Sequence, residues 1–193
     1  MNKDKLNNLP VFKKAEEISN LIYKFTELIF DDSFEDIDME NDVVTDIAMT
    51  IRNDSQIIPT KIVGAEAVKL YGIKMANAAI IRQAAIEIST STYSLELFGF
   101  TENDYLEIIR NEIDEFRVLF AEWVKTFDSD IYMIDNWGLF NPIGVEYDDY
   151  EDDASFESGM FFGDDFFEDD SFRIDRFDDD DDFPLDFDDD MPF

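Results

Sequence analysis

The chain has 193 residues, with 15 Lys and Arg against 48 Asp and Glu, which gives a formal net charge of −33. It contains no Cys and no His, so disulfides, zinc sites built from those ligands and His-based acid–base catalysis are excluded. A surface this acidic repels phosphate backbones, which disfavours direct binding of nucleic acid, and it attracts basic proteins instead.

The charge divides the chain into a body and a tail. Up to Asp128 there are 13 basic and 24 acidic residues, a net charge of −11, and beyond it there are 2 basic and 24 acidic residues, a net charge of −22. We expect a helical bundle over residues 1–128, a strap or linker over 129–145 and a disordered acidic tail over 146–193.

The first half of the body predicts two amphipathic helices. Between Pro10 and Phe30, apolar residues recur at steps of three and four, the spacing that places them on one helix face. A second helix is expected from about Val43, and Pro59 should kink or end it because proline lacks an N–H group. We favour a kinked helix that continues past Pro59, with a break over 60–71 as the alternative.

The third helix is expected from Ile73 to Phe98, ended by Gly99 in the left-handed conformation. A stripe of small and apolar residues in it would permit close packing: Ile73, Ala76, Ile80, Ala84 and Ile88.

The fourth helix carries the clearest periodicity in the chain. Thr101 followed by Asp104 resembles a capping box that would open it. Its apolar residues then recur at helical spacing: Tyr105, Ile109, Ile113, Phe116, Phe120, Trp123 and Phe127. Four helices with short connections predict an all-α four-helix bundle, because each apolar face can be buried only against the others.

The segment from Asp128 to Pro142 is too apolar for a free linker, and we expect an extended aromatic strap across the bundle; a linker whose aromatic residues adhere to it is the alternative. From Glu146 to Phe193 there are 22 acidic residues, 2 basic residues and 10 Phe. Because clustered like charge prevents collapse into a core, we expect disorder there, with the Phe side chains contacting a partner or the bundle.

The body resembles a four-helix-bundle family that includes proteins encoded in intervening sequences of bacterial ribosomal RNA genes and the accessory variability protein of diversity-generating retroelements. The resemblance covers about residues 9–127. Its matching positions lie at the start of the first helix, around the proline, and at the turn into the last helix: Leu9, Val11, Lys14, Ala15, Ile51, Arg52, Ile58, Pro59, Ile62, Leu97, Gly99, Phe100, Thr101, Glu102 and Tyr105. The resemblance implies the bundle fold and a homo-oligomer, since the retroelement protein forms a pentameric ring.

The end of the sequence shows a second resemblance. It reads Asp186, Phe187, Asp188, Asp189, Asp190, Met191, Pro192 and Phe193. This is similar to the tip of bacterial single-stranded-DNA-binding proteins, Asp-Phe-Asp-Asp-Asp-Ile-Pro-Phe, with Met191 in place of Ile. The resemblance implies docking onto replication, recombination and repair enzymes.

The chemistry of these eight residues suits docking. A terminal Phe193 can fill an apolar pocket while its α-carboxylate pairs with an Arg at the rim. Pro192 restricts the backbone before this anchor, and the aspartates would face a basic ridge. The alternative is that a tail made of Asp and Phe produces such a string by chance.

Two other groups of residues could bear on function. Arg52, Lys61, Lys69, Lys74 and Arg82 concentrate positive charge on the middle helices and could face a nucleic acid or the chain's own tail. Glu66 and Glu87 could form a carboxylate pair, with solvated faces or oligomer contacts as the safer interpretation.

No selective metal site is expected. The run Asp178–Asp182 predicts weak cation condensation, because no Asp-x-Asp-x-Asp-Gly loop is present. We expect no cofactor.

Residues 1–10 lack the apolar core of a signal peptide, and no run long enough for a membrane span appears, so a cytoplasmic protein is expected.

Among the possible functions, an enzyme ranks last because no coherent catalytic set can be named. We expect an interaction protein that docks through its tip onto DNA-metabolism proteins. The alternatives are a nucleic-acid mimic that occupies a basic site, and a nucleic-acid-binding bundle inhibited by its tail.

Overall fold

The computed structural model describes residues 3–33 and 39–149, and within these ranges the protein is helical with no β-strand. A short helix α1 (Lys3–Asn7) precedes four long ones: α2 (Pro10–Ser33), α3 (Met39–Glu66), α4 (Tyr71–Leu97) and α5 (Asn103–Val124). At 1.5 Å per residue the long helices span about 33 to 42 Å. The predicted all-α four-helix bundle is confirmed.

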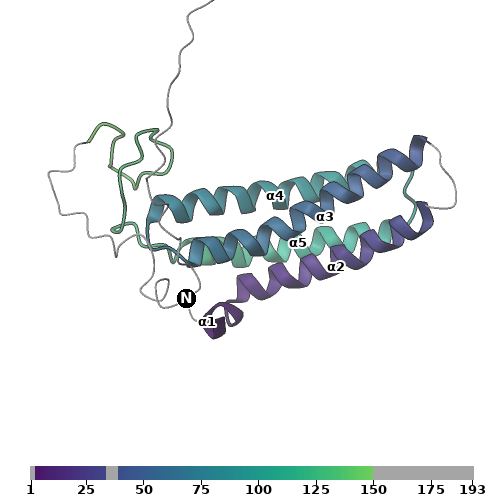
Figure 1. Ribbon diagram of the computed structural model, residues 1–193, viewed down its shortest axis with the longest axis horizontal. Helices are drawn as coiled ribbons and strands as arrows, with labels where there is room; N and C mark the ends of the chain where they lie inside the picture. The colour runs from purple at the N-terminus through teal and green to yellow at the C-terminus, as the bar shows by residue number, and fades with distance from the viewer. Residues whose placement is uncertain (1–2, 34–38, 150–193) are drawn as a thin grey trace, which may run out of the picture.

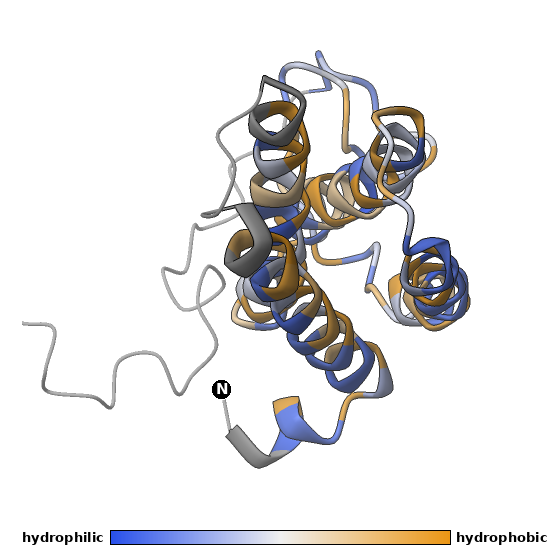
Figure 2. Cartoon of the chain, turned by 90° about the vertical axis from the view of Figure 1, so that its right-hand side faces the viewer, coloured by the Kyte–Doolittle hydropathy of each residue, from blue (hydrophilic) through white to orange (hydrophobic). Residues whose placement is uncertain are grey.

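The four long helices run side by side in alternating directions, with α1, the start of α4 and the loop after α5 at one end (Figure 1). Each long helix packs against two neighbours, and α3 with α4 forms the most extensive interface. Seen from the end, apolar residues face the centre of the bundle (Figure 2). This arrangement closes a ring in the order α2, α3, α4, α5.

Every long helix contributes branched aliphatic side chains to one continuous core. The largest fully buried side chains include Ile18, Ile22, Ile51, Ile58, Ile62, Ile81, Ile88, Leu95, Leu106, Ile109 and Phe116. Burying such side chains supplies most of the free energy that holds a bundle together, about 1.5 to 3 kcal/mol for each large one.

The helix that contains the internal proline continues through it. α3 begins at Met39, earlier than the expected start near Val43, and includes Pro59 within its length. The prediction of a helix that continues past Pro59 is therefore confirmed. Close packing on α4 follows from Gly64, because a Cβ there would lie 3.3 Å from Oδ1 of Asn77.

The end of α4 has the predicted glycine cap. Gly99 has a φ of +91°, its N–H donates to the carbonyl of Glu96 at 3.2 Å, and the N–H of Phe100 donates to the carbonyl of Leu95 at 3.0 Å. This pair of hydrogen bonds is a Schellman motif. Phe100 then packs edge-on against Phe25 of α2, with ring centroids 5.5 Å apart.

The capping box predicted before the last helix is wrong. The residue that precedes α5 is Glu102, and no side chain there caps the helix. Thr101 instead accepts a hydrogen bond at its backbone carbonyl from the N–H of Asn103. The tight turn that follows Gly99 shifts the start of the helix, so the Thr101 hydroxyl does not serve as its cap.

The apolar stripe predicted for α4 is only half right. Ala84 and Ile88 are buried, whereas Ile73 and Ile80 are 36% and 41% exposed. The buried face of α4 comprises Ala78, Ile81, Ala84, Ile88, Thr92 and Leu95. The error arises because α4 has apolar residues on all sides, so periodicity alone did not distinguish the face that packs.

Residues 128–149 do not form the extended strap expected across the bundle. They fold into a series of turns at the end of the bundle where α4 begins (Figure 1). A backbone hydrogen bond of 2.7 Å, from the N–H of Tyr71 to the carbonyl of Ile131, joins this segment to the start of α4. The segment is therefore a folded cap on one end of the bundle.

Candidate interaction surfaces

The predicted docking tip lies outside the described residues. Asp186 to Phe193 belong to residues 150–193, and of the predicted tail only residues 146–149 are described. Candidate surfaces on the described part of the chain are the predicted basic residues and the turns after α5.

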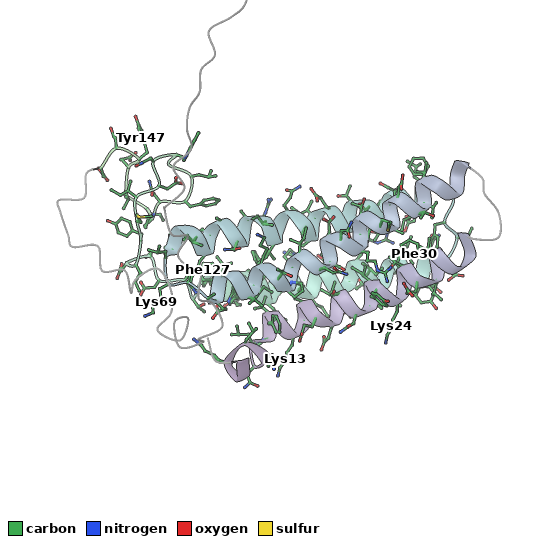
Figure 3. All side chains as sticks on the ribbon, viewed as in Figure 1. Lys13, Lys24, Phe30, Lys69, Phe127 and Tyr147 are labelled. Atoms are coloured by element: carbon green, nitrogen blue, oxygen red, sulfur yellow. The ribbon has the colours of Figure 1, made fainter. Side chains whose placement is uncertain are left out.

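Arg52, the first of the predicted basic residues, contacts α2. Its guanidinium lies 2.6 Å from a carboxylate oxygen of Glu27, 4.0 Å from the ring centroid of Tyr23 and 5.2 Å from that of Phe30. An ion pair and two aromatic faces therefore engage this cation. Phe30 lies at the end of the bundle opposite to Lys69 (Figure 3).

Lys74 is engaged at the other end of the bundle. Its Nζ lies 3.8 Å from Oε1 of Glu66 and 5.0 Å from the ring centroid of Phe127. The same Glu66 oxygen accepts a hydrogen bond of 2.9 Å from Nε1 of Trp123. Burial lowers the pKa of Lys74, and the Glu66 carboxylate opposes that change. Lys74 of α4 therefore pairs with Glu66 of α3 and contacts Phe127 just beyond α5, while Glu66 also bonds to Trp123 of α5.

The other three predicted basic residues differ in how exposed they are. Lys69 is exposed in the turn between α3 and α4, Arg82 is exposed on α4, and Lys61 is half-buried on α3. With Arg52 and Lys69 at opposite ends, the five residues do not gather into a single patch, contrary to the prediction. Helical spacing places the five residues on adjacent helices. It does not reveal that neighbouring acidic and aromatic side chains cover Arg52 and Lys74.

Asp135 organises a compact loop after α5. Its carboxylate accepts backbone N–H groups from Trp137 at 3.0 Å, Leu139 at 3.0 Å and Phe140 at 3.1 Å. The hydrogen bond from Trp137 is the main cause that holds the pKa of Asp135 below its ordinary value. Gly138 N–H also donates to the Asp135 carbonyl at 2.8 Å, which closes a turn. We call residues 135–141 the Asp135 loop.

Asn141 closes the Asp135 loop from its other end. Its Oδ1 accepts the N–H of Asp135 at 2.7 Å, and its Nδ2 donates to the Asp135 carbonyl at 3.1 Å. These bonds fix the loop backbone from both sides. The pattern of Asp followed three residues later by Gly is a turn signal that could have predicted this feature.

The Asp135 loop forms one wall of an apolar pocket of about 510 Å³. The other wall is the start of α4. The lining residues are Leu70, Gly72, Ile73, Ala76 and residues 133–137, 139 and 140. Such a volume lies within the range of about 300 to 1,000 Å³ that ligand pockets occupy.

Large apolar side chains project from the same loop into solvent. Trp137 is 94% exposed and Leu139 is 72% exposed, and Ile143 just beyond them is fully exposed. Isolated exposed apolar residues are common, but a contiguous group on a hydrogen-bonded loop beside a pocket is typical of a binding surface. We call the pocket with Trp137 and Leu139 the end pocket.

Glu66 and Glu87 do not form a carboxylate pair. Glu66 bonds to Trp123, whereas Glu87 accepts a hydrogen bond of 2.5 Å from Gln83 and lies near Asp54. The Oδ2 atom of Asp54 is buried without a hydrogen-bond partner. Burial raises the pKa of Asp54 to about 6, and the Glu87 carboxylate adds to the shift.

Within residues 3–33 and 39–149, no group of three or more acidic side chains is placed to hold a metal ion. None of the described helices is long and apolar enough to cross a membrane.

Comparisons with protein-family models, with curated proteins and with solved structures found no match. The two resemblances noted above therefore rest on the residues that carry them.

Proposed function

We propose that this chain is a non-enzymatic interaction protein whose segment Asp186–Phe193 docks onto proteins of DNA replication, recombination or repair. The observation that carries the proposal is the order of these eight residues, which differs from the tip of bacterial single-stranded-DNA-binding proteins only at Met191. The bundle acts as the carrier of this segment. If the bundle oligomerises, several tips bind together and strengthen weak individual contacts.

The described part of the chain supports this role in a second way. Arg52 and Lys74 are already engaged by carboxylates and aromatic rings. Binding of a phosphate backbone depends on cations that can displace its counterions, so the engagement of these two residues leaves fewer cations on the bundle for direct contact with DNA. A protein partner with a basic ridge fits the charge of −33 better.

The test is a binding measurement with an enzyme that recognises the tip of single-stranded-DNA-binding proteins. Phe193→Ala should weaken binding at least about tenfold, because removing a buried aromatic anchor typically costs 2 kcal/mol or more. Phe183→Ala is the matched control, since it removes the same side chain outside the eight-residue tip. The proposal also requires that Phe193 carry a free α-carboxylate, so adding one Gly after it should weaken binding.

The same titration addresses the alternative of a nucleic-acid mimic. A mimic would bind through many carboxylates, so its affinity would fall steeply with salt and survive the loss of residues 191–193. Affinity for the enzyme that is equal in the wild-type, Phe193→Ala and extended chains would remove the docking proposal.

A further inference from the structure

The end pocket has an apolar interior, and one of its walls belongs to an acidic segment, residues 128–149, which we call the acidic surround. Asp135 is the only charged residue among those that line it. The whole segment 128–149 contains six acidic residues and no basic one: Asp128, Asp130, Asp135, Glu146, Asp148 and Asp149. A complementary ligand would therefore carry apolar anchors together with positive charge.

One segment outside the described residues has this composition. Beyond Asp149 the chain contains only two basic residues, Arg173 and Arg176, and both lie within Phe172–Phe177. The six residues read Phe-Arg-Ile-Asp-Arg-Phe, so three large apolar side chains alternate with the two cations. Every other Phe from residue 150 onward lies in a stretch whose charged residues are all acidic.

We propose that Phe172–Phe177 docks in the end pocket of the same chain. Its aromatic side chains fill the cavity beside Ile73 and Ala76, and its arginines approach the acidic surround and the exposed face of Trp137. An arginine over an indole ring is attracted by the ring electrons, and the attraction is stronger when water is excluded.

The connection is long enough for this contact. The described chain leaves the bundle beside the end pocket, because the Cβ of Tyr147 lies 3.3 Å from where a Cβ on Gly138 would be. A random coil of 23 residues, the separation of Asp149 from Phe172, would span about 26 Å on average, and repulsion among acidic residues would lengthen it. Linkers of this kind give effective concentrations in the millimolar range, so even a weak contact would be well populated.

A second copy of the chain fits the end pocket less well. Pairing two such ends would bring two acidic segments 128–149 and two acidic tails together, and like charges repel most strongly at close range. Contact within one chain instead places the only two cations of the tail against the acidic surround. Docking at Phe172–Phe177 would also divide the tail and leave Asp186–Phe193 free beyond the contact.

The test uses the absence of cysteine, because Ser171→Cys then gives a single position for a nitroxide spin label. In the full-length protein, the amide signals of Ile73, Ala76 and Leu139 should lose about half their intensity or more, since a millimolar effective concentration half-fills a site of millimolar affinity. Signals from the opposite end of the bundle, such as that of Phe30, should keep theirs.

Matched variants of the labelled protein separate the proposed contact from others. Reversing the charge by Arg173→Glu with Arg176→Glu should restore the signals, whereas Arg173→Lys with Arg176→Lys should leave them reduced. Phe193→Ala should change nothing, which keeps this test independent of the docking proposal.

Two results would overturn the inference. One is a loss of intensity that is the same in the charge-reversed protein. The other is an equal loss when unlabelled, isotope-enriched chains are mixed with spin-labelled ones, because that result would show contact between two copies.

Discussion

Asp54 differs from the other buried polar residues that the structure describes. The hydroxyls of Thr26, Ser55 and Thr92 donate to carbonyls within their own helices. Asp54 is only 7% exposed, and its Oδ2 has no partner. An acid buried in this way favours its neutral form, and its pKa rises to about 6.

The direction of the pH effect follows from this shift. In the unfolded chain Asp54 ionises near its ordinary value of 3.8, and in the folded chain it ionises near 6. Below the lower value both states hold the proton, and Asp54 costs no stability. As the pH rises through this window the folded state is increasingly penalised, and above about 6 the penalty is complete.

Asp54→Asn should therefore stabilise the protein above neutral pH. We expect a gain of about 1 to 3 kcal/mol at pH 8, and a smaller gain at pH 5, where Asp54 is largely protonated in the folded state. Urea unfolding at the two pH values measures the difference, with Glu87→Gln as a control of smaller effect. A variant less stable than the wild type at pH 8 would show that the carboxylate has a favourable partner.

At the scale of the helices, sequence periodicity predicts which segments are helical better than it predicts which face of each helix is buried. α2 and α5 have charged residues opposite a clear apolar face. In α5 the predicted Ile109, Ile113, Phe116 and Trp123 are buried, whereas Tyr105 is 41% exposed and its neighbour Leu106 lies in the core. α4 has only four charged residues among 27, namely Lys74, Arg82, Glu87 and Glu96. So few charged residues mark its outer face only weakly, and Ile73 and Ile80 were therefore assigned to the wrong side.

The candidate surfaces were harder to predict, for a physical reason. The end pocket exists because Asp135 accepts three backbone N–H groups and thereby folds an otherwise irregular segment. That network depends on contacts within the loop rather than on a repeating pattern. The engagement of Arg52 and Lys74 likewise depends on which helices become neighbours, a property that one helix alone does not show.

The turn between α4 and α5 allows a test at this scale. Gly99 has a φ of +91° and open space around it, so a Cβ would cause backbone strain without a steric clash. Gly99→Ala should lower the free energy of unfolding by about 1 to 2 kcal/mol. Gly99→Asn should cost less, since asparagine tolerates the left-handed conformation, and chemical denaturation of both variants measures the contrast. Equal losses in the two variants would argue against conformational strain.

Across the whole molecule, charge opposes compactness. The chain carries −33, and its 15 basic residues cannot neutralise its 48 acidic ones, even with ion pairs such as Glu112 with Lys14 and Glu96 with Arg110. Self-repulsion of this kind weakens the folded state and is reduced when salt shortens the range of the interaction to about 8 Å at physiological strength.

Raising NaCl from about 20 mM to 500 mM should therefore increase the midpoint of thermal unfolding by a few degrees, which corresponds to roughly 1 kcal/mol for a chain of this size. Calorimetry or circular dichroism measures the change. Because a protein held together chiefly by ion pairs would lose stability under the same conditions, a fall in the midpoint would contradict this interpretation.

The ring of four helices has a consequence for synthesis on the ribosome. α3 and α4 are joined by a short turn and share the largest interface, so this hairpin can form as soon as both helices emerge. Closure waits for α5, whose Glu115 meets a lysine of α2 that was made 101 residues earlier. Until then the apolar faces of the first helices stay open to other nascent chains, while the acidic stretch after Asp128, which carries two-thirds of the net charge, has yet to be made.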